Sequence, residues 1–245
     1  MKGVTLTYLE KVLCFCSFDL MPTNEKYLQK LEPEVFYHIY NRTNNSELLF
    51  KSDKNRLYFL KKYAVYLSGY LKTYAYCLMD NHFHLLVQVR SEQDIITTIK
   101  NTAIENRLAI HKKVLEQTNV NIDFPAIINK QFNRWFTVYA MAFNRHQNRK
   151  GNLFHRPFKR LKVKDNFYLS QLIYYIHANP VLHKVRKKFT DYQWSSYQSF
   201  LSEKPTLLER EAVLNWFGDK VEFIQFHNTQ HCFTGIECLD IERDY

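Results

Sequence analysis

Glycine and proline are scarce in this sequence, which has 5 glycines and 6 prolines among 245 residues. Flexible or extended linkers are rich in such residues, so we expect no long linker. The five cysteines are an odd number and include no Cys-x-x-Cys pair. They do not suggest the framework of a secreted disulfide-rich protein and fit a reducing cytoplasm. No run of about 18 apolar residues occurs, so we expect no membrane span.

Acidic residues are missing from two long stretches, residues 55–79 and 124–164. Between residues 134 and 188 there are 13 Lys and Arg against one acidic residue, Asp165, so this stretch carries +12 while the whole chain carries +10. A focused basic region indicates a polyanionic partner, because phosphates neutralised by Lys and Arg release counterions. The alternative is a basic face that is merely solvated.

The rest of the composition is that of a globular protein, with 46% hydrophobic, 24% charged and 16% aromatic residues. A chain of this length can bury a sizeable core in one domain with additions. β-Branched, aromatic and alternating stretches predict strands, and apolar residues at helical spacing predict helices. The expected strands are 35–42, 70–79, 82–90 and 158–164, and the expected helices are 53–68, 92–113, 131–146 and 167–178.

Three boundaries depend on local signals. Residues 114–130, which include Asn119, Asn121 and Pro125, are expected to be a loop insertion, and Pro180 is expected to stop the last of these helices. Thr206 to Glu209 has the form of a capping box that opens a short C-terminal helix. Without the extra helix the order is β-α-β-β-α-β, so the expected fold is an α+β, ferredoxin-like sandwich with an antiparallel sheet. That layout covers one face of the sheet and leaves the other free for a site.

The strand expected at 82–90 carries a His-x-His pair. Alternation puts Phe83 on a core face and both His82 and His84 on the other face. Two adjacent imidazoles disfavour protonation, and the neutral imidazole is the form that binds a metal. A pair of surface histidines is the alternative, since His-x-His alone is a weak motif. Two histidines also leave coordination positions for a third ligand.

The helix expected at 167–178 offers that ligand. Tyr175 and Asn179 are four residues apart, so they are neighbours on one flank of the helix. This places a phenol beside an amide oxygen that can ligate a hard cation. A nearby dication could lower the phenol pKa from its usual value of about 10. Tyr175 is therefore a candidate nucleophile, with Tyr174 next in line, and the alternative is an aromatic at the core margin.

Four motifs together resemble one family. Residues 79–87, MDNHFHLLV, resemble the His-hydrophobic-His motif of the HUH single-strand transposases and relaxases. Residues 151–163, GNLFHRPFKRLKV, resemble a segment of the REP-associated tyrosine transposases. Residues 175–181, YIHANPV, resemble their tyrosine helix, and residues 191–197, DYQWSSY, the stretch that follows it. The motifs occur in the order of the family and span about residues 33–200.

The resemblance implies a chemistry. It implies one catalytic tyrosine, Tyr175, and a divalent metal, Mg²⁺ or Mn²⁺, held by His82, His84 and Asn179. Asn179 stands where insertion-sequence relatives carry glutamine. The implied substrate is single-stranded DNA with hairpins, and the implied intermediate is a 5′-phosphotyrosine with a free 3′-hydroxyl. The expected function is that of a transposase, a single-stranded DNA endonuclease and strand transferase. It would act in the cytoplasm, associated with the nucleoid, as a monomer or a homodimer.

The resemblance also suggests domain boundaries, and the sequence departs from the family pattern at two places. We expect an N-terminal extension at 1–30, the catalytic domain at 31–202 and a C-terminal extension at 203–245. Asp80 stands where relatives commonly carry proline, and residues 114–130 are longer than in compact members. These departures bear on substrate choice more than on chemistry.

A basic segment with interleaved phenylalanines is the expected DNA-binding surface, because cations can follow phosphates while aromatic rings stack on bases. The alternative is that the phenylalanines, Phe158 above all, belong to the core. The expected DNA-binding residues are Arg145, Arg149, Lys150, Arg156, Lys159, Arg160, Lys162 and Lys164.

Two other functions remain open at this stage. One is a catalytically inactive nucleic-acid-binding regulatory protein of the same fold. The other is a zinc hydrolase, which is disfavoured because a plausible acidic ligand or base is lacking: no Asp or Glu occurs between Lys54 and Asp80 or between Asp123 and Asp165.

Overall fold

The structure is a computed structural model that describes residues 27–103, 105, 108–116, 122–163 and 166–229. Strands and helices alternate along the chain and confirm the α+β class. In chain order the elements are β1 (Phe36–Arg42), η1 (Asn44–Ser46), α2 (Asp53–Leu67), β2 (Leu71–Leu78), β3 (His82–Val89), α3 (Glu92–Asn101), α4 (Ala109–Glu116), α5 (Phe124–His146), β4 (Lys159–Lys162), α6 (Asn166–Leu182), η3 (Phe189–Asp191), α7 (Tyr197–Leu201), α8 (Arg210–Phe217) and α9 (Lys220–Asn228).

The four strands form one sheet in the order β2-β3-β1-β4, and every neighbouring pair is antiparallel. The register pairs Tyr40 with His84 and Arg42 with His82. Directly opposed residues of an antiparallel pair project from the same face. The His-x-His side chains therefore share a face with the even-numbered residues of β1.

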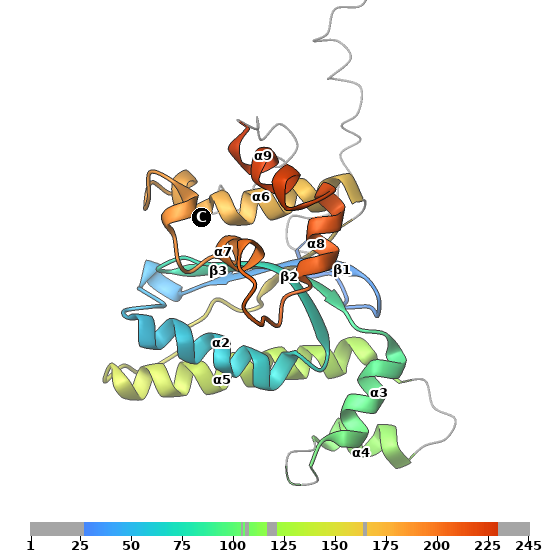
Figure 1. Cartoon of the computed structure of the whole chain (residues 1–245). Coiled ribbons are helices and arrows are strands. Elements are labelled where there is room, and N and C mark those ends of the chain that lie inside the picture. Colours follow the sequence, from blue (N-terminus) through green and yellow to red (C-terminus); the bar gives the residue numbers. More distant parts are fainter. Residues whose placement is uncertain (1–26, 104, 106–107, 117–121, 164–165, 230–245) are drawn as a thin grey trace, which may run out of the picture.

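The first face of the sheet packs on α2 and α5, which run side by side beneath it (Figure 1). Phe83, Leu85 and Val87 belong to this core, as expected from the alternation. At its centre the indole Nε1 of Trp135, on α5, donates a hydrogen bond to the carbonyl of Phe59, on α2, at 3.1 Å. This bond satisfies the one polar atom of a fully buried tryptophan.

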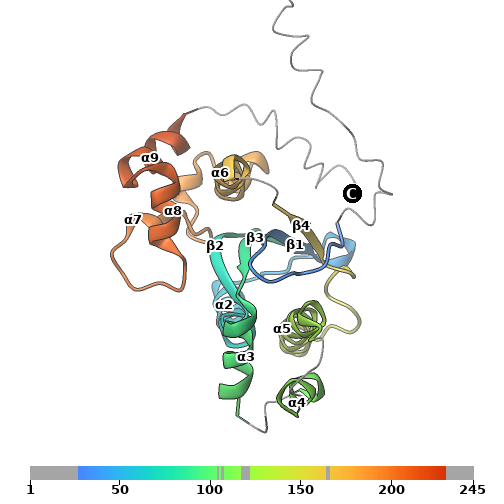
Figure 2. The same cartoon turned by 90° about the vertical axis from the view of Figure 1, so that its right-hand side faces the viewer.

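The second face of the sheet is covered, so the expectation that it is left free is wrong. In the view turned by 90°, α6 and the C-terminal helices α7, α8 and α9 lie on this side (Figure 2). Leu86 on β3 packs with Leu172 and Ile176 of α6 in a second core. The reason is the strongly apolar character of α6, which needs a partner surface and finds it on the sheet.

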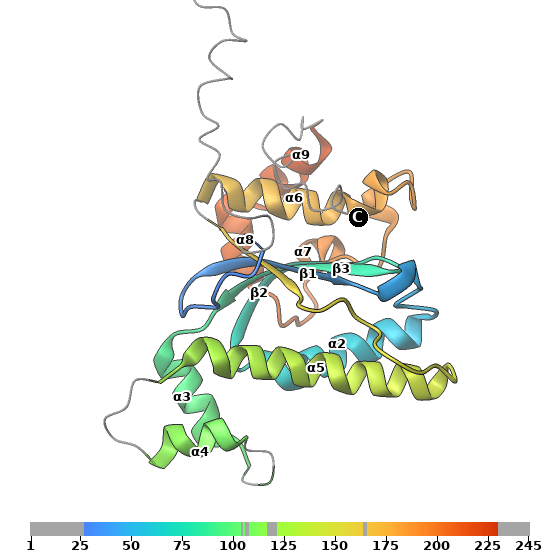
Figure 3. The ribbon, with the colours of Figure 1, turned by 180° about the vertical axis from the view of Figure 1, so that it is seen from behind.

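The expectation of a loop over residues 114–130 is wrong for its last part, because α5 already begins at Phe124 and runs for 23 residues (Figure 3). Asp123 caps the helix by accepting the amide hydrogen of Ala126 at 2.9 Å. Pro125 falls in the first turn, where a missing backbone N–H is harmless. The helix expected at 92–113 is divided into α3 and α4.

Two further boundaries differ from expectation. Helix α6 continues through Pro180 to Leu182, and the amide of His183 still donates to the carbonyl of Asn179 at 2.9 Å. Pro180 stands in the last turn, so little of the ladder is lost. Helix α8 begins at Arg210 after the N-cap residue Glu209, so Thr206 is not its cap.

Both expected extensions contribute packed residues. In the N-terminal part, Tyr27 is buried against Tyr40 and Leu161, and Leu28 bridges to Arg160. In the C-terminal part, Val213 of α8 and Phe223 of α9 are buried in the second core with α6. Among the described residues, no helix is long and apolar enough to cross a membrane.

Candidate active site

The sheet and α6 bring the expected active-site residues together on one side of the sheet. His82 and His84 project from β3, and Tyr175 and Asn179 from α6. The rings of His84 and Tyr175 lie edge to face with centroids 5.6 Å apart, and those of His82 and His84 are 5.1 Å apart. We call these four residues, together with His38 of β1, the histidine–tyrosine cluster.

His38 is the member of the cluster that the sequence did not reveal. Its Nε2 lies 3.0 Å from Nδ1 of His84, and its ring is 6.1 Å from that of Tyr175, centroid to centroid. Burial lowers the pKa of His38 to about 3. Burial, together with the charges of the neighbouring histidines, also holds the pKa of His84 well below its usual value. Both rings are therefore neutral at pH 7.

The hydrogen bonds of the two motif histidines fix how their rings are presented. Nδ1 of His82 lies 2.7 Å from Oδ1 of Asn81, which only accepts, so Nδ1 carries the proton and the lone pair is on Nε2. When His84 donates from Nδ1 to His38, its lone pair is also on Nε2. Partners of this kind orient metal-binding histidines and set their tautomer.

Three residues of the cluster each have a buried atom with no hydrogen-bond partner among the described residues. These atoms are Nδ1 of His38, Nε2 of His84 and Oδ1 of Asn179. The amide of Asn179 is held from its other end, since Nδ2 donates to the carbonyl of Tyr175 at 2.9 Å. A buried polar atom left unpaired costs about 1–3 kcal/mol, so the unpaired atoms of His84 and Asn179 indicate a ligand. An imidazole nitrogen and an amide oxygen fit a divalent cation.

The cluster is poor in charged ligands. No group of three or more His, Cys, Asp or Glu side chains among the described residues is arranged to hold a metal ion. A cation here would be held by His82, His84 and the neutral oxygen of Asn179, with the rest of its shell from water or substrate. His183, just past α6, lies near this set with its ring centroid 4.9 Å from that of His82.

The two adjacent tyrosines of α6 face different partners. Tyr175 is 7% exposed and contacts His38 and His84, whereas Tyr174 contacts His227 of α9. His177 also faces the C-terminal helices: its ring nitrogens lie 2.8 Å from Ser196 Oγ and 2.9 Å from His227 Nε2. His177 is thus not directed to Tyr175.

Asp80, the residue at the position where relatives carry proline, has a structural partner. It forms an ion pair with Arg56 of α2, a side chain that is itself buried. The guanidinium of Arg56 also lies 5.5 Å from the ring of Trp194. This contact joins the turn before His82 to α2 and to the 191–197 motif.

The expected DNA-binding residues fall into two groups. Arg145, Lys150 and Arg156 are exposed. Arg149 is held by a bidentate ion pair with Glu47, with bonds of 2.5 and 3.0 Å. Three others also have partners. Arg160 donates to the carbonyls of Gln29 and Leu28, and Lys162 pairs with Glu32 at 2.9 Å. Lys159 lies 4.5 Å from the ring of Tyr27, and Lys164 lies outside the described residues.

The phenylalanines of the basic segment are core residues. Phe143, Phe154 and Phe158 are all buried in the first core. They offer no open ring face, so the expectation that they stack on bases is wrong and the alternative holds. In this segment Arg145, Lys150 and Arg156 are exposed, whereas the three phenylalanines are not.

Comparison with known proteins gives one likeness. A solved structure of a REP-associated tyrosine transposase bound to a REP hairpin aligns with a TM-score of 0.46 and 13% sequence identity, over 72% of this chain and 86% of the other. No protein-family model matches the sequence, and no curated protein does either. At these values the likeness does not establish membership of that family.

Proposed function

We propose that this protein is a metal-dependent single-stranded DNA endonuclease and strand transferase of the transposase type, with Tyr175 as its nucleophile. One observation carries the proposal. β3 ends at Val89 and α6 begins only at Asn166, yet the fold places the phenol ring of Tyr175 against the two neutral histidines His38 and His84. Had α6 packed on the opposite face of the sheet, this chemistry would have no basis.

The fold is compatible with the proposal. The element order and the strand order β2-β3-β1-β4 support a ferredoxin-like arrangement in which the cluster lies between the sheet and α6. β4, the edge strand of the same sheet, belongs to the acid-free stretch of sequence from residue 124 to 164, whose positive charge can attract a polyanion. Since one chain supplies every residue of the cluster, a monomer is sufficient for the chemistry.

The proposed reaction is a phosphoryl transfer. The oxygen of Tyr175 loses its proton and attacks a backbone phosphorus, the bond from phosphorus to the 3′-oxygen breaks, and that oxygen leaves as a hydroxyl. The product is a 5′-phosphotyrosine, whose bond energy allows a 3′-hydroxyl to attack later and release the tyrosine. His38 orients His84, and Asn81 orients His82. A divalent cation held by His82, His84 and Asn179 would offset the negative charge that develops on the phosphate.

A second candidate is a catalytically inactive nucleic-acid-binding regulatory protein. The burial of Tyr175 and Asn179 favours it, because a phosphate must reach both side chains for the reaction to occur. The basic edge of the sheet would serve this function equally well.

A denaturing gel separates the two candidates. The protein is mixed with a 5′- or 3′-labelled hairpin oligonucleotide carrying single-stranded flanks, with Mg²⁺ or Mn²⁺. If the protein is the proposed enzyme, the gel shows a covalent adduct. The adduct is absent when a chelator is added and absent with Tyr175→Phe, whereas the matched control Tyr174→Phe still forms it. Binding without any adduct, at all flank sequences and with both metals, supports the regulatory protein.

A further inference from the structure

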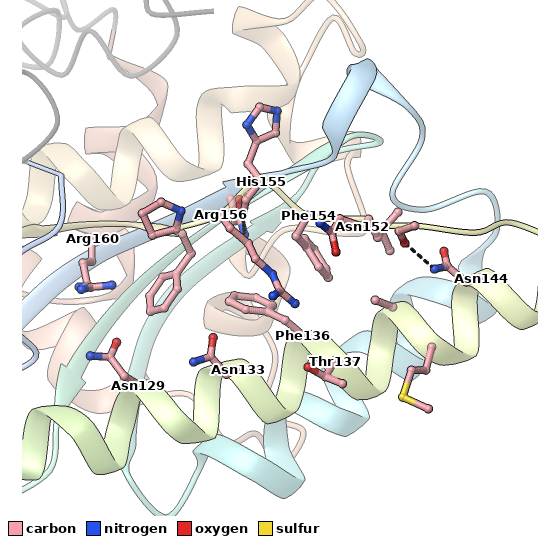
Figure 4. A pocket seen from close by; sticks show the side chains of 17 residues that line it. Asn129, Asn133, Phe136, Thr137, Asn144, Asn152, Phe154, His155, Arg156 and Arg160 are labelled. Carbon is pink, nitrogen blue, oxygen red and sulfur yellow. Dashed lines mark hydrogen bonds between the residues drawn. The ribbon is translucent and has the colours of Figure 1, made fainter.

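A polar cleft lies on the opposite face of the sheet from the histidine–tyrosine cluster. It has a volume of about 660 Å³ and runs between α5 and the segment of residues 151–160 that leads into β4 (Figure 4). None of the cluster residues lines it. The residues that line it therefore require an explanation separate from the proposed cleavage chemistry.

One wall of the cleft is a row of polar side chains on α5. Asn129, Asn133 and Thr137 follow one another at intervals of four residues, which is about 6 Å of helix. Figure 4 shows the amides of Asn129 and Asn133 directed at the opposite segment. Neither amide is hydrogen-bonded to another described residue. Asparagine is a poor helix former, so two of them facing one cleft are not explained by the stability of α5.

The opposite wall is cationic. The guanidinium of Arg156 points toward α5, and Arg156 is exposed (Figure 4). Arg160 also lines the cleft. It donates to the neutral carbonyls of Gln29 and Leu28 and lies 5.0 Å from the ring of Phe158, and it has no ion pair with an acidic residue in the described part of the chain. No acidic residue occurs in the stretch 124–163 that supplies α5, the opposite segment and β4. The floor is apolar, formed by the buried rings of Phe136 and Phe158.

This combination matches the chemistry of an unpaired nucleotide strand. An asparagine amide both donates and accepts, as the edge of a nucleobase does, and it is the usual partner of adenine. A guanidinium matches a phosphate. The Watson–Crick edges of bases are free only in a single strand. A single strand is also the form that can enter a cleft of this kind. Amides one helical turn apart are suited to successive unstacked bases.

The cleft is also connected to the cluster around the edge of the sheet. His155 and Arg156 are consecutive but point to opposite sides, with His155 directed away from α5 (Figure 4). The backbone amide of His155 donates to the carbonyl of Arg42, at 2.9 Å, and Arg42 is paired in register with His82. Burial lowers the pKa of His155, and the charges of Arg42 and Lys159 lower it further. A cationic rim thus joins the two faces.

We propose that the cleft between α5 and residues 151–158 is a second binding site for single-stranded DNA, which reads the bases of the strand that flanks the hairpin. That a single nucleic-acid strand binds there follows from the cleft itself. That the strand is DNA, and that it continues to the cluster, rests on the proposed function.

The test uses fluorescence anisotropy of the full chain with labelled dA, dC, dT and mixed-sequence 12-mers, a matched RNA 12-mer and a duplex. The double variant Asn129→Ala, Asn133→Ala is expected to lose affinity for its preferred DNA strand by about tenfold, with less effect on the others. Arg156→Ala is expected to weaken all DNA strands equally and to make the dependence on salt shallower. Asn228→Ala, an exposed amide on α9, is the matched control and is expected to bind as the wild type.

Three results would overturn the proposal. In one, the double asparagine variant binds every DNA strand as the wild type does, with its circular dichroism unchanged. In another, the duplex binds as tightly as the single strands and loses the same affinity in the variant. In the third, the RNA strand binds more tightly than DNA and shows the same loss, which would make RNA the ligand. Because binding is measured without metal, failure here is distinct from failure of the cleavage reaction.

Discussion

Nε2 of His38 lies 3.0 Å from Nδ1 of His84, and both rings are buried. These two residues face one another because β1 and β3 are paired antiparallel and project His38 and His84 from the same side of the sheet. The contact can hold His84 in the tautomer whose Nε2 accepts a metal ion. In the proposed function, a histidine from the first strand would therefore set the tautomer of a ligand on the His-x-His strand.

Replacement of His38 tests this role. His38→Phe removes the acceptor for His84 and is expected to weaken Mn²⁺ binding by about 10- to 100-fold, the usual effect of losing such a partner. His38→Gln retains an accepting amide oxygen and is expected to restore much of the affinity. Titration calorimetry with Mn²⁺ alone gives both values. Equal affinity of His38→Phe and the wild type would show that His38 only fills space.

The motif histidines themselves are expected to be required for cleavage. His82→Ala and His84→Ala should each reduce the rate of metal-dependent cleavage by orders of magnitude, because each removes a ligand of the cation that stabilises the reacting phosphate. His146→Ala, an exposed histidine at the end of α5, is the control and should cleave normally. Initial rates on a hairpin oligonucleotide provide the comparison, and an unchanged rate for His82→Ala would remove the metal from the account.

Affinity for a single strand is expected to fall steeply with salt. At least three exposed cations, Arg145, Lys150 and Arg156, can contact phosphates, which predicts a log–log slope of about −2 or steeper. Lys150→Ala should make this slope shallower. The adjacent Arg149 is already neutralised by Glu47, so Arg149→Gln should change the slope little. A flat salt dependence of the wild type would contradict the basic interface.

Stability is expected to decrease with acid below about pH 6.5. Burial lowers the pKa of His177 well below its usual value and that of His38 to about 3, so both are neutral in the folded state. The unfolded chain takes up protons first, and each such histidine removes up to about 1.4 kcal/mol of stability per pH unit. The loss begins near pH 6.5 and, for His38, continues toward pH 3. Thermal unfolding between pH 8 and 5 measures it; His38→Phe should flatten the profile, and a wild-type profile that rises toward acid would contradict the assignment.

Sequence periodicity was sufficient to predict where the strands lie and that His82 and His84 share one face of their strand. Alternation along a strand depends only on neighbouring residues. It also placed Tyr175 and Asn179 on one flank of a helix. It was insufficient for His38, which pairs with Leu86 and so lies diagonally across from His84, because this position depends on which strands pair and in what register. Pairing of distant strands is decided by the whole fold and leaves no local signal.

Two errors came from giving local signals too much weight. Pro180 was expected to end α6, yet the helix continues for two residues, and this brings His183 close to His82. Pro125 lies in the stretch predicted to be a loop, although a proline in a first turn is compatible with a helix. The covered second face of the sheet was also missed, since α6 was interpreted only as the carrier of Tyr175 and Asn179, while α8 and α9 come after the motifs and carry no motif of their own.

The most direct test of the account is to identify the residue that carries the DNA. A denatured adduct from the wild-type protein, a hairpin oligonucleotide and Mn²⁺ is digested with protease and nuclease, and the peptides are sequenced by mass spectrometry. The account predicts a nucleotide 5′-phosphate on the oxygen of Tyr175 alone. A nucleotide on Tyr174 or on any other residue, or cleavage that leaves no nucleotide on the protein, would contradict it.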